Sequence, residues 1–169
     1  SLEVSRLALE KARADRRILR ICWETNGYMN PKLAEKAAQY SLESGGNIKF
    51  DLKAWSEELN VALCGVSNKP TFANFKMMGE KFYEKRKEPP VICASTLLVS
   101  GYIDAKEVEK IAKFISEIDQ NIPYTLLAFY PCYVMNDLPP TSRKQATECQ
   151  SAAQKYLKNT RIGNVHLLS

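Results

Sequence analysis

The sequence lacks the features that mark membrane proteins, secreted proteins and several well-known enzyme classes. No apolar run approaches the roughly 20 residues that a membrane span needs, and no charged start with an apolar segment marks a signal peptide. The motifs GxGxxG, GxxxxGK(S/T), GxSxG and HExxH are absent, which argues against dinucleotide enzymes, P-loop ATPases, elbow-type serine hydrolases and zincins. With 169 residues, 45% of them hydrophobic, we expect one soluble, cytoplasmic domain over residues 1–169.

Close pairs of cysteines are also absent, and there is a single histidine. The five cysteines are Cys22, Cys64, Cys93, Cys132 and Cys149. A zinc or iron–sulfur site needs pairs such as CxxC, because two thiolates on one tight turn must reach one metal. We therefore interpret these cysteines as reduced and buried, and by itself their pattern predicts no metal site. His166 lies between two apolar residues and is interpreted as a structural residue on the last strand.

The charge balance is only mildly basic. The net charge is +5 and the sequence pI is near 8.9. The one basic cluster, KFYEKRK over residues 81–87, contains Glu84 and is typical of a solvated helix face. We therefore do not expect nucleic acid as a partner.

Short apolar runs alternate with helical periodicities along the chain. Strands are predicted over residues 18–23, 47–52, 91–99, 123–130 and 164–168. Helices are predicted over residues 2–16, 31–43, 55–65, 71–87, 104–118 and 142–158, with Asp104 as an N-cap. This alternation favours βαβ units and a parallel sheet, and the nearly continuous apolar strands predict that both faces are covered. Five strands fit either an open doubly wound sheet or part of a barrel.

Polar residues gather where the predicted strands end. Glu24-Thr25-Asn26-Gly27 follows the first strand, and Asp51 and Lys53 end the second. Ligands of parallel α/β folds bind at this edge, because all the βα loops meet there. Two carboxylates there could hold a cation or orient an ammonium group. An ordinary turn at Asn26-Gly27 and a plain ion pair between Asp51 and Lys53 explain the same residues.

The order of these segments resembles the radical S-adenosylmethionine enzymes. ICWETNG is followed by IKFDLKA, then by a buried strand that runs into SGYIDAKEVEKIAKFI, and then by a strand ending in FYP. The series covers residues 18–168 and is similar to the glycyl-radical activating enzymes, in the branch of pyruvate formate-lyase activating enzyme. In that group the third barrel strand ends in a (D/E)TNG motif and the fourth in a D-L-K motif.

The resemblance implies an α/β fold, a partial parallel (β/α) barrel. It would contain strands 3 to 6 of a (β/α)6 barrel plus a short C-terminal strand, and would lack the first two strands. It also implies that the complete parent enzyme uses S-adenosylmethionine and a [4Fe–4S] cluster. Reductive cleavage of the cofactor would give a 5′-deoxyadenosyl radical that abstracts hydrogen from a glycyl-radical protein or a small-molecule substrate.

The same resemblance assigns roles to residues at the strand ends. Glu24, Thr25 and Asp51 would lie near the methionine end of the cofactor, where some members of the family hold a monovalent cation. Asn26 would shape the turn, and Lys53 would reach the carboxylate or the ribose of the cofactor. Tyr130 ends the strand predicted over 123–130, where activating enzymes often carry histidine, and is also expected among the cofactor-binding residues.

Two family motifs are missing from the sequence: the CxxxCxxC loop that binds the cluster and the Gly-Gly-Glu-Pro type strand end. We therefore expect the C-terminal part of a longer enzyme, inactive alone, with neither cluster nor cofactor bound. Without two strands, the sheet edge at the first strand would be unpaired. This predicts self-association through that edge, or a first helix that covers it.

Two other functions remain open on the residues alone. A cluster-free α/β domain could bind a nucleotide or a phosphorylated metabolite at the same edge. A small barrel lyase or isomerase could use Lys53 as its working amine, with Asp51 or Glu24 as the acid–base partner.

Overall fold

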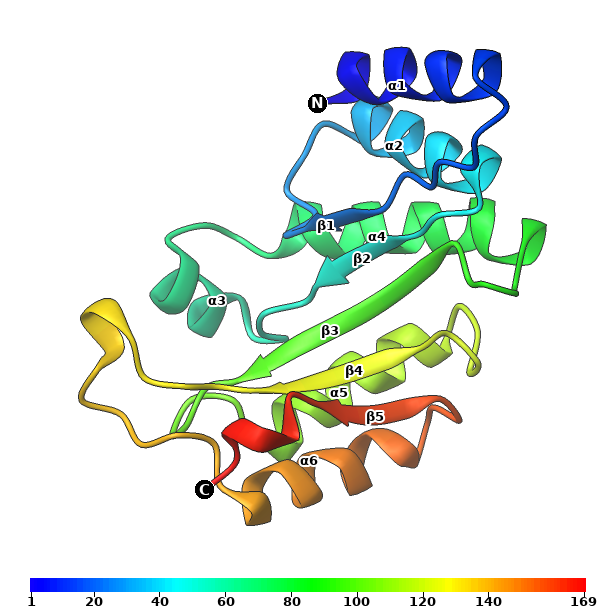
Figure 1. Ribbon diagram of the computed structural model, residues 1–169. Coiled ribbons are helices and arrows are strands. Elements are labelled where there is room, and N and C mark those ends of the chain that lie inside the picture. Colours follow the sequence, from blue (N-terminus) through cyan, green and yellow to red (C-terminus); the bar gives the residue numbers. More distant parts are fainter.

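The computed structural model describes residues Ser1–Ser169 and shows an α/β fold around one parallel sheet (Figure 1). The strands are β1 (Trp23–Thr25), β2 (Ile48–Asp51), β3 (Ile92–Leu98), β4 (Tyr124–Ala128) and β5 (Thr160–Gly163). The helices are α1 (Leu2–Ala14), α2 (Pro31–Ser44), α3 (Glu57–Cys64), α4 (Lys69–Phe82), α5 (Ala105–Ser116) and α6 (Arg143–Gln154), with 3-10 turns η1 (Tyr83–Lys85), η2 (Tyr133–Met135) and η3 (Val165–Leu167). The strand order is β1-β2-β3-β4-β5 and every neighbouring pair is parallel, which confirms the predicted series of βα units.

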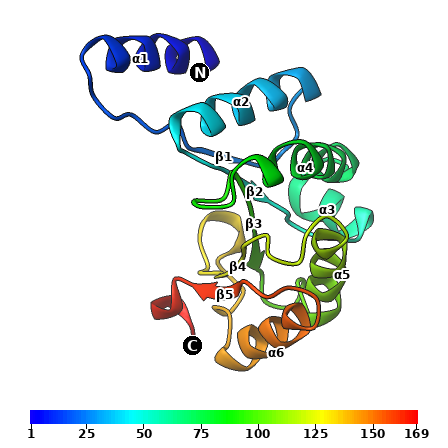
Figure 2. The same ribbon diagram turned by 90° about the vertical axis from the view of Figure 1, so that its right-hand side faces the viewer.

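Helices α4, α5 and α6 lie along one face of the sheet (Figure 2). Strand residues on that face are buried, as Phe50 and Tyr124 are. Their neighbours Lys49, Asp51 and Thr125 point to the opposite face and remain partly exposed. The prediction that both faces are covered is therefore wrong, because along β2 and β4 only alternate residues are fully buried.

Aromatic rings join the sheet to α4 and α5. The ring of Phe50 meets that of Phe75 edge to face, with centroids 5.3 Å apart. Phe72 and Phe114 pack in the same way at 4.9 Å, and Trp55 lies 5.3 Å from Phe72. Such pairs stabilise the fold beyond the area that they bury. Through Trp55 and Phe72, they also fix the loop after β2 against these helices.

The first strand begins later than predicted. Ile18 is 92% exposed, and β1 starts only at Trp23. The N–H of Ile21 donates to Ser44 Oγ at 2.8 Å, and its carbonyl accepts from Ser41 Oγ at 3.0 Å. Because the backbone of this segment bonds to side chains of α2 and not to β2, the strand prediction over residues 18–22 is wrong.

The last strand also differs from the prediction. β5 covers Thr160–Gly163, and residues 165–167 form the 3-10 turn η3, so His166 is not on a strand. Asn164 ends the strand in a left-handed conformation with φ 41°. Its side chain accepts from Ala128 N at 2.8 Å and donates to Ala128 O at 3.0 Å, which continues the β4–β5 pairing without a further strand residue.

The cysteines are less buried than predicted. All five are free, but only Cys149 is buried and Cys93 is partly so. Cys22, Cys64 and Cys132 are exposed, because they lie before β1, at the end of α3 and in the loop after β4, outside the core.

At the N-terminal end of the fold, α1 packs mainly against α2, and Leu9 is its buried residue. β1 pairs with β2 and with no other strand, so its second edge has no strand beside it. None of the helices has the length and apolarity that crossing a membrane requires.

Candidate functional site

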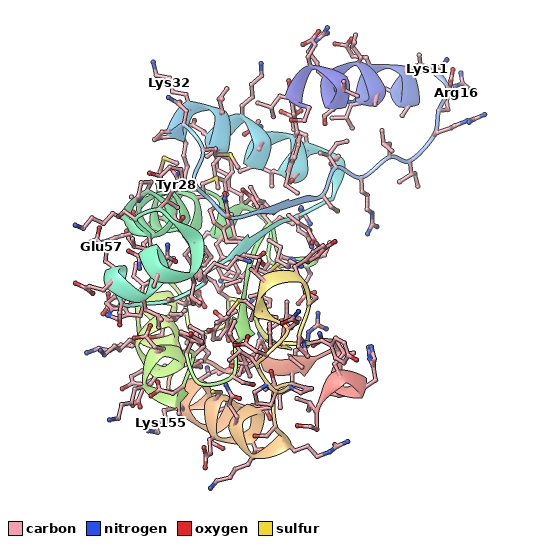
Figure 3. All side chains as sticks on the ribbon, turned by 90° about the vertical axis from the view of Figure 1, so that its left-hand side faces the viewer. Lys11, Arg16, Tyr28, Lys32, Glu57 and Lys155 are labelled. Carbon is pink, nitrogen blue, oxygen red and sulfur yellow. The ribbon has the colours of Figure 1, made fainter.

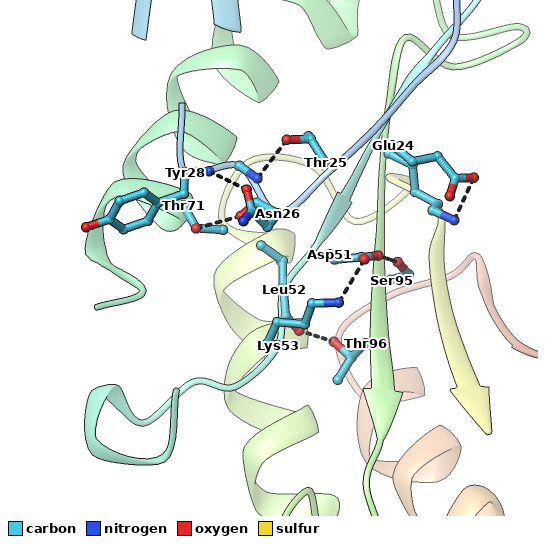
Figure 4. A network of polar contacts seen from close by, with 12 residues as sticks. Glu24, Thr25, Asn26, Tyr28, Asp51, Leu52, Lys53, Thr71, Ser95 and Thr96 are labelled. Carbon is cyan, nitrogen blue, oxygen red and sulfur yellow. Dashed lines mark hydrogen bonds and ion pairs between the residues drawn. The ribbon is translucent and has the colours of Figure 1, made fainter. Parts of the chain in front are cut away.

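A tight turn after β1 begins the candidate site. The hydroxyl of Thr25 accepts from Gly27 N at 3.0 Å, and Asn26 Oδ1 accepts from Tyr28 N at 3.1 Å (Figure 4). Gly27 has φ +72°, and a Cβ there would lie 2.7 Å from Cδ1 of Phe50. The turn thus needs glycine for both its conformation and its close approach to β2. The side chain of Asn26 thus takes part in this turn through one hydrogen bond to its backbone.

Two polar side chains of α4 also hydrogen-bond to the backbone of this turn and of the residues just after it. Thr71 Oγ1 donates to Asn26 O at 2.7 Å, and Asn74 Nδ2 donates to the carbonyls of Gly27 and Met29, both at 2.8 Å. Sequence reasoning missed both residues. The available signal was weak: two polar residues on the face of a helix that otherwise buries aromatic and apolar side chains.

The carboxylate of Asp51 is the charged centre of the site. It accepts from Lys53 Nζ at 2.8 Å and from the hydroxyl of Ser95 on β3 (Figure 4). Partial burial acts to raise the pKa of Asp51, but the bonds from Lys53 and Ser95 outweigh it and lower that pKa below its ordinary value. Asp51 therefore stays ionised, and the pair presents a carboxylate and an ammonium side by side.

A small cavity of about 100 Å³ opens beside this pair. It is lined by Asn26, Tyr28, Asp51, Lys53, Asn60, Cys64, Val66, Asn68, Thr71 and Phe72. Figure 3 looks onto this side of the molecule, where Tyr28 marks the loop after β1 and Glu57 marks the start of α3. Burial raises the pKa of the Cys64 thiol, while the nearby charge of Lys53 acts to lower it. The cavity thus combines opposite charges, amides and a thiol at the carboxyl edge of the sheet.

Not all the predicted site residues enter this cavity. Glu24 points to the open face of the sheet and pairs with Lys49 at 2.9 Å. Thr25 is on the opposite face of β1, because neighbouring strand residues alternate, and its hydroxyl is used within the turn. Tyr130 is 58% exposed on the loop after β4 and does not line the cavity. The structure therefore brings Asn26, Asp51 and Lys53 together, and leaves the other three outside.

The residues of this chain do not form a ligand set for the iron–sulfur cluster. No three His, Cys, Asp or Glu side chains lie close enough to hold a metal ion. Each of the three side chains that the resemblance assigns to a monovalent cation has another partner: Glu24 pairs with Lys49, the Thr25 hydroxyl accepts from Gly27 N, and Asp51 pairs with Lys53.

No protein-family model matches the chain. The chain is 28% identical, over 135 residues, to a Methanocaldococcus jannaschii protein whose name places it among the glycyl-radical enzyme activating enzymes. The match covers 80% of this chain and 49% of that protein, so the chain spans about half the length of this curated relative.

The fold has a solved counterpart. The structure is similar, with a TM-score of 0.67, to the crystal structure of a domain of pyruvate-formate lyase-activating enzyme from Bacteroides vulgatus. The likeness covers 96% of this chain and 93% of that domain at 14% identity, which shows a shared fold. The predicted partial barrel is thereby confirmed. In sequence the chain is similar to part of a protein named as a glycyl-radical enzyme activating enzyme, and in fold it is similar to a domain of a pyruvate-formate lyase-activating enzyme.

Proposed function

We propose that this chain forms the part of a radical S-adenosylmethionine activating enzyme that binds the amino-acid end of the cofactor. The observation that carries the proposal is the Asp51–Lys53 pair, placed in a cavity at the carboxyl edge of the sheet. Lys53 would contact the carboxylate of the cofactor and Asp51 its amino group. Asn26 would support them by fixing the neighbouring turn.

The cavity fits only one end of the cofactor. Its volume of about 100 Å³ is below the ~300 Å³ of the smallest usual ligand pockets. In this proposal the adenosine part extends out of the cavity toward Tyr130, which lies on the loop after β4. Glu24 would contribute to a monovalent cation site near the methionine end of the cofactor only if its carboxylate broke the ion pair with Lys49.

The chemistry belongs to the complete enzyme. When bound together, S-adenosylmethionine and a [4Fe–4S] cluster supply a 5′-deoxyadenosyl radical for hydrogen abstraction. We propose a glycyl-radical protein as the partner, because the Methanocaldococcus relative is named for activating such enzymes. This chain's own part would be to bind and orient the cofactor through Asp51 and Lys53.

A titration followed by NMR tests cofactor binding by the chain. With S-adenosylmethionine or S-adenosylhomocysteine as the probe, we expect weak, saturable shifts centred on Asn26, Asp51 and Lys53. Lys53→Met and Asp51→Asn should remove them, because each deletes one charge of the pair. Lys110→Met, at an exposed position of α5, is the matched control.

Three outcomes would contradict the proposal. The first is no shift at any concentration, and the second is a set of shifts away from the cavity. In the third, ADP or inorganic phosphate binds at Asp51 and Lys53 and neither S-adenosyl compound does. That outcome would favour the nucleotide-binding alternative.

A further inference from the structure

We infer that Glu107 is a positioning residue for Lys53, an inference that rests on the function proposed above. Glu107 lies in the first turn of α5 and is only 8% exposed. Its Oε2 accepts from Trp55 N at 2.7 Å and from Ser56 N at 3.0 Å, and its Oε1 accepts from Ser56 Oγ. All three bonds reach the segment that directly follows Lys53.

The helix after this segment explains why a carboxylate is needed there. Ser56 is the N-cap of α3, yet its side chain makes no capping bond within that helix. The N–H groups at a helix start have no partner in the helix itself, and a negative charge there is favourable. Glu107 thus caps α3 from a different helix, and these bonds offset the cost of burying its charge.

Two further side chains hold the backbone around Lys53. Thr96 Oγ1 of β3 donates to Leu52 O at 2.6 Å, just before the lysine (Figure 4). Asn68 Nδ2 donates to Ala54 O at 3.0 Å and to Trp55 O at 2.8 Å, just after it. With Glu107, the backbone on both sides of Lys53 is bonded to three separate parts of the fold.

The backbone at Glu107 is itself held in place. Asp104, the N-cap of α5, accepts from Lys106 N and Glu107 N, both at 2.9 Å. Glu107 does not line the cavity, so it would not contact the cofactor. Its effect on the site would pass through the backbone of residues 54–56 to the ammonium of Lys53.

The test compares Glu107→Ala with Glu107→Gln. The glutamine can still accept from both backbone N–H groups, while Ser56 Oγ turns to accept from its amide. The alanine can do neither. Glu109→Gln is the matched control on the same helix, because Glu109 bonds to Lys155 and Tyr156, away from the site.

Two readouts separate positioning from general stability. The first is the rate at which Lys53 reacts with an amine-acylating reagent, measured by peptide mass spectrometry against exposed Lys76. The second is the affinity for S-adenosylhomocysteine.

We expect Glu107→Ala to speed Lys53 labelling several-fold relative to Lys76, since the ion pair between Lys53 and Asp51 loosens. We also expect it to weaken binding by about tenfold, the lower end of the loss that follows when a residue orienting a metal ligand is removed. Glu107→Gln and Glu109→Gln should stay near the parent values.

The failures of the two proposals are distinguishable. If the parent chain does not bind the probe, the proposed function fails, while Lys53 labelling still tests the positioning role. A folded Glu107→Ala chain with unchanged Lys53 labelling would overturn the inference. If that variant does not fold, Glu107→Asp takes its place: it is one methylene shorter, and unchanged Lys53 labelling in it would overturn the inference equally.

Discussion

Among single residues, Asp51 links the candidate site to the stability of the fold. Its pKa in the folded chain lies below the ordinary value of about 3.9. The folded state therefore binds fewer protons than the unfolded state near this pKa, and ionised Asp51 stabilises the fold above about pH 4. That contribution is lost as the pH falls through the folded-state pKa.

Asp51→Asn should therefore lower the free energy of unfolding near neutral pH by about 1 kcal/mol. The difference from the parent chain should shrink below about pH 4. Urea unfolding across an acid pH series measures it. Ser95→Ala, which removes one of the two bonds to the carboxylate, should give a smaller effect of the same form. A difference that stays constant with pH would show that Asp51 does not contribute through its charge.

The five thiols should divide by environment. Burial raises the pKa of Cys149 to about 12. Burial also raises that of Cys93 to about 11, although Lys49 and Arg161 oppose this. Because the thiolate is the reactive form, an aromatic disulfide reagent should modify the three exposed cysteines first and these two only after unfolding. Cys132→Ser should reduce the number of rapidly reacting thiols in the folded chain by one, and Cys149→Ser should leave that number unchanged. Rapid reaction of all five thiols would contradict this division.

At the scale of elements, the turn between β1 and α2 depends on glycine. Gly27 and Gly65 have nearly the same φ, +72° and +74°, but only at Gly27 would a Cβ meet other atoms. Gly65→Ala should cost about 1 kcal/mol for the left-handed backbone alone. Gly27→Ala should cost about 1–3 kcal/mol more, because the added carbon collides with Phe50. Chemical denaturation of both variants measures the difference, and equal losses would mean that the turn relaxes away from Phe50.

Local sequence signals predicted the first residues of the helices well and the boundaries of strands β1 and β5 poorly. Asp104 bonds to backbone N–H groups of its own helix, as predicted, and Asn30 does the same at the start of α2. Asn68 precedes α4 but bonds instead to the loop after β2, so its role has no local signal. Ile21 fails as a strand residue because α2 takes its backbone groups, and Asn164 ends β5 by bonding to β4. Such partners are distant in sequence, which is why periodicity alone could not find them.

For the molecule as a whole, the site residues that the sequence could predict are those that follow directly after strands. Asp51 and Lys53 could be found because parallel strands end at one edge of the sheet. Thr71, Asn74 and Glu107 come from helices and reach the site across 45 to 52 residues of sequence. Glu24 stands at a strand end too, but its side chain points to the open face and pairs with Lys49. The predicted strand ends thus indicated the edge of the sheet at which the site lies, but only the folded structure shows which side chains line one cavity.

The unpaired edge of β1 leads to a prediction about the oligomeric state of the whole molecule. Trp23 N donates to Asn47 O at 2.9 Å, and in a parallel pair the N–H of the next residue points away from that partner. The N–H of Glu24 therefore lies on the edge that has no strand beside it. An unpaired strand edge can pair with a second copy. We expect the isolated chain to form dimers that sedimentation velocity detects as concentration rises.

Two substitutions at one position identify the interface. Glu24→Pro removes the outward N–H and keeps the inward bonds of β1, so it should weaken the dimer. Glu24→Ala keeps that N–H while losing the same carboxylate and its pairing with Lys49, so it should associate as the parent does. Equal weakening by both variants would assign the contact to the side chain of Glu24. A parent chain that remains monomeric at every concentration would show that this short edge, only three residues long, is too small to pair.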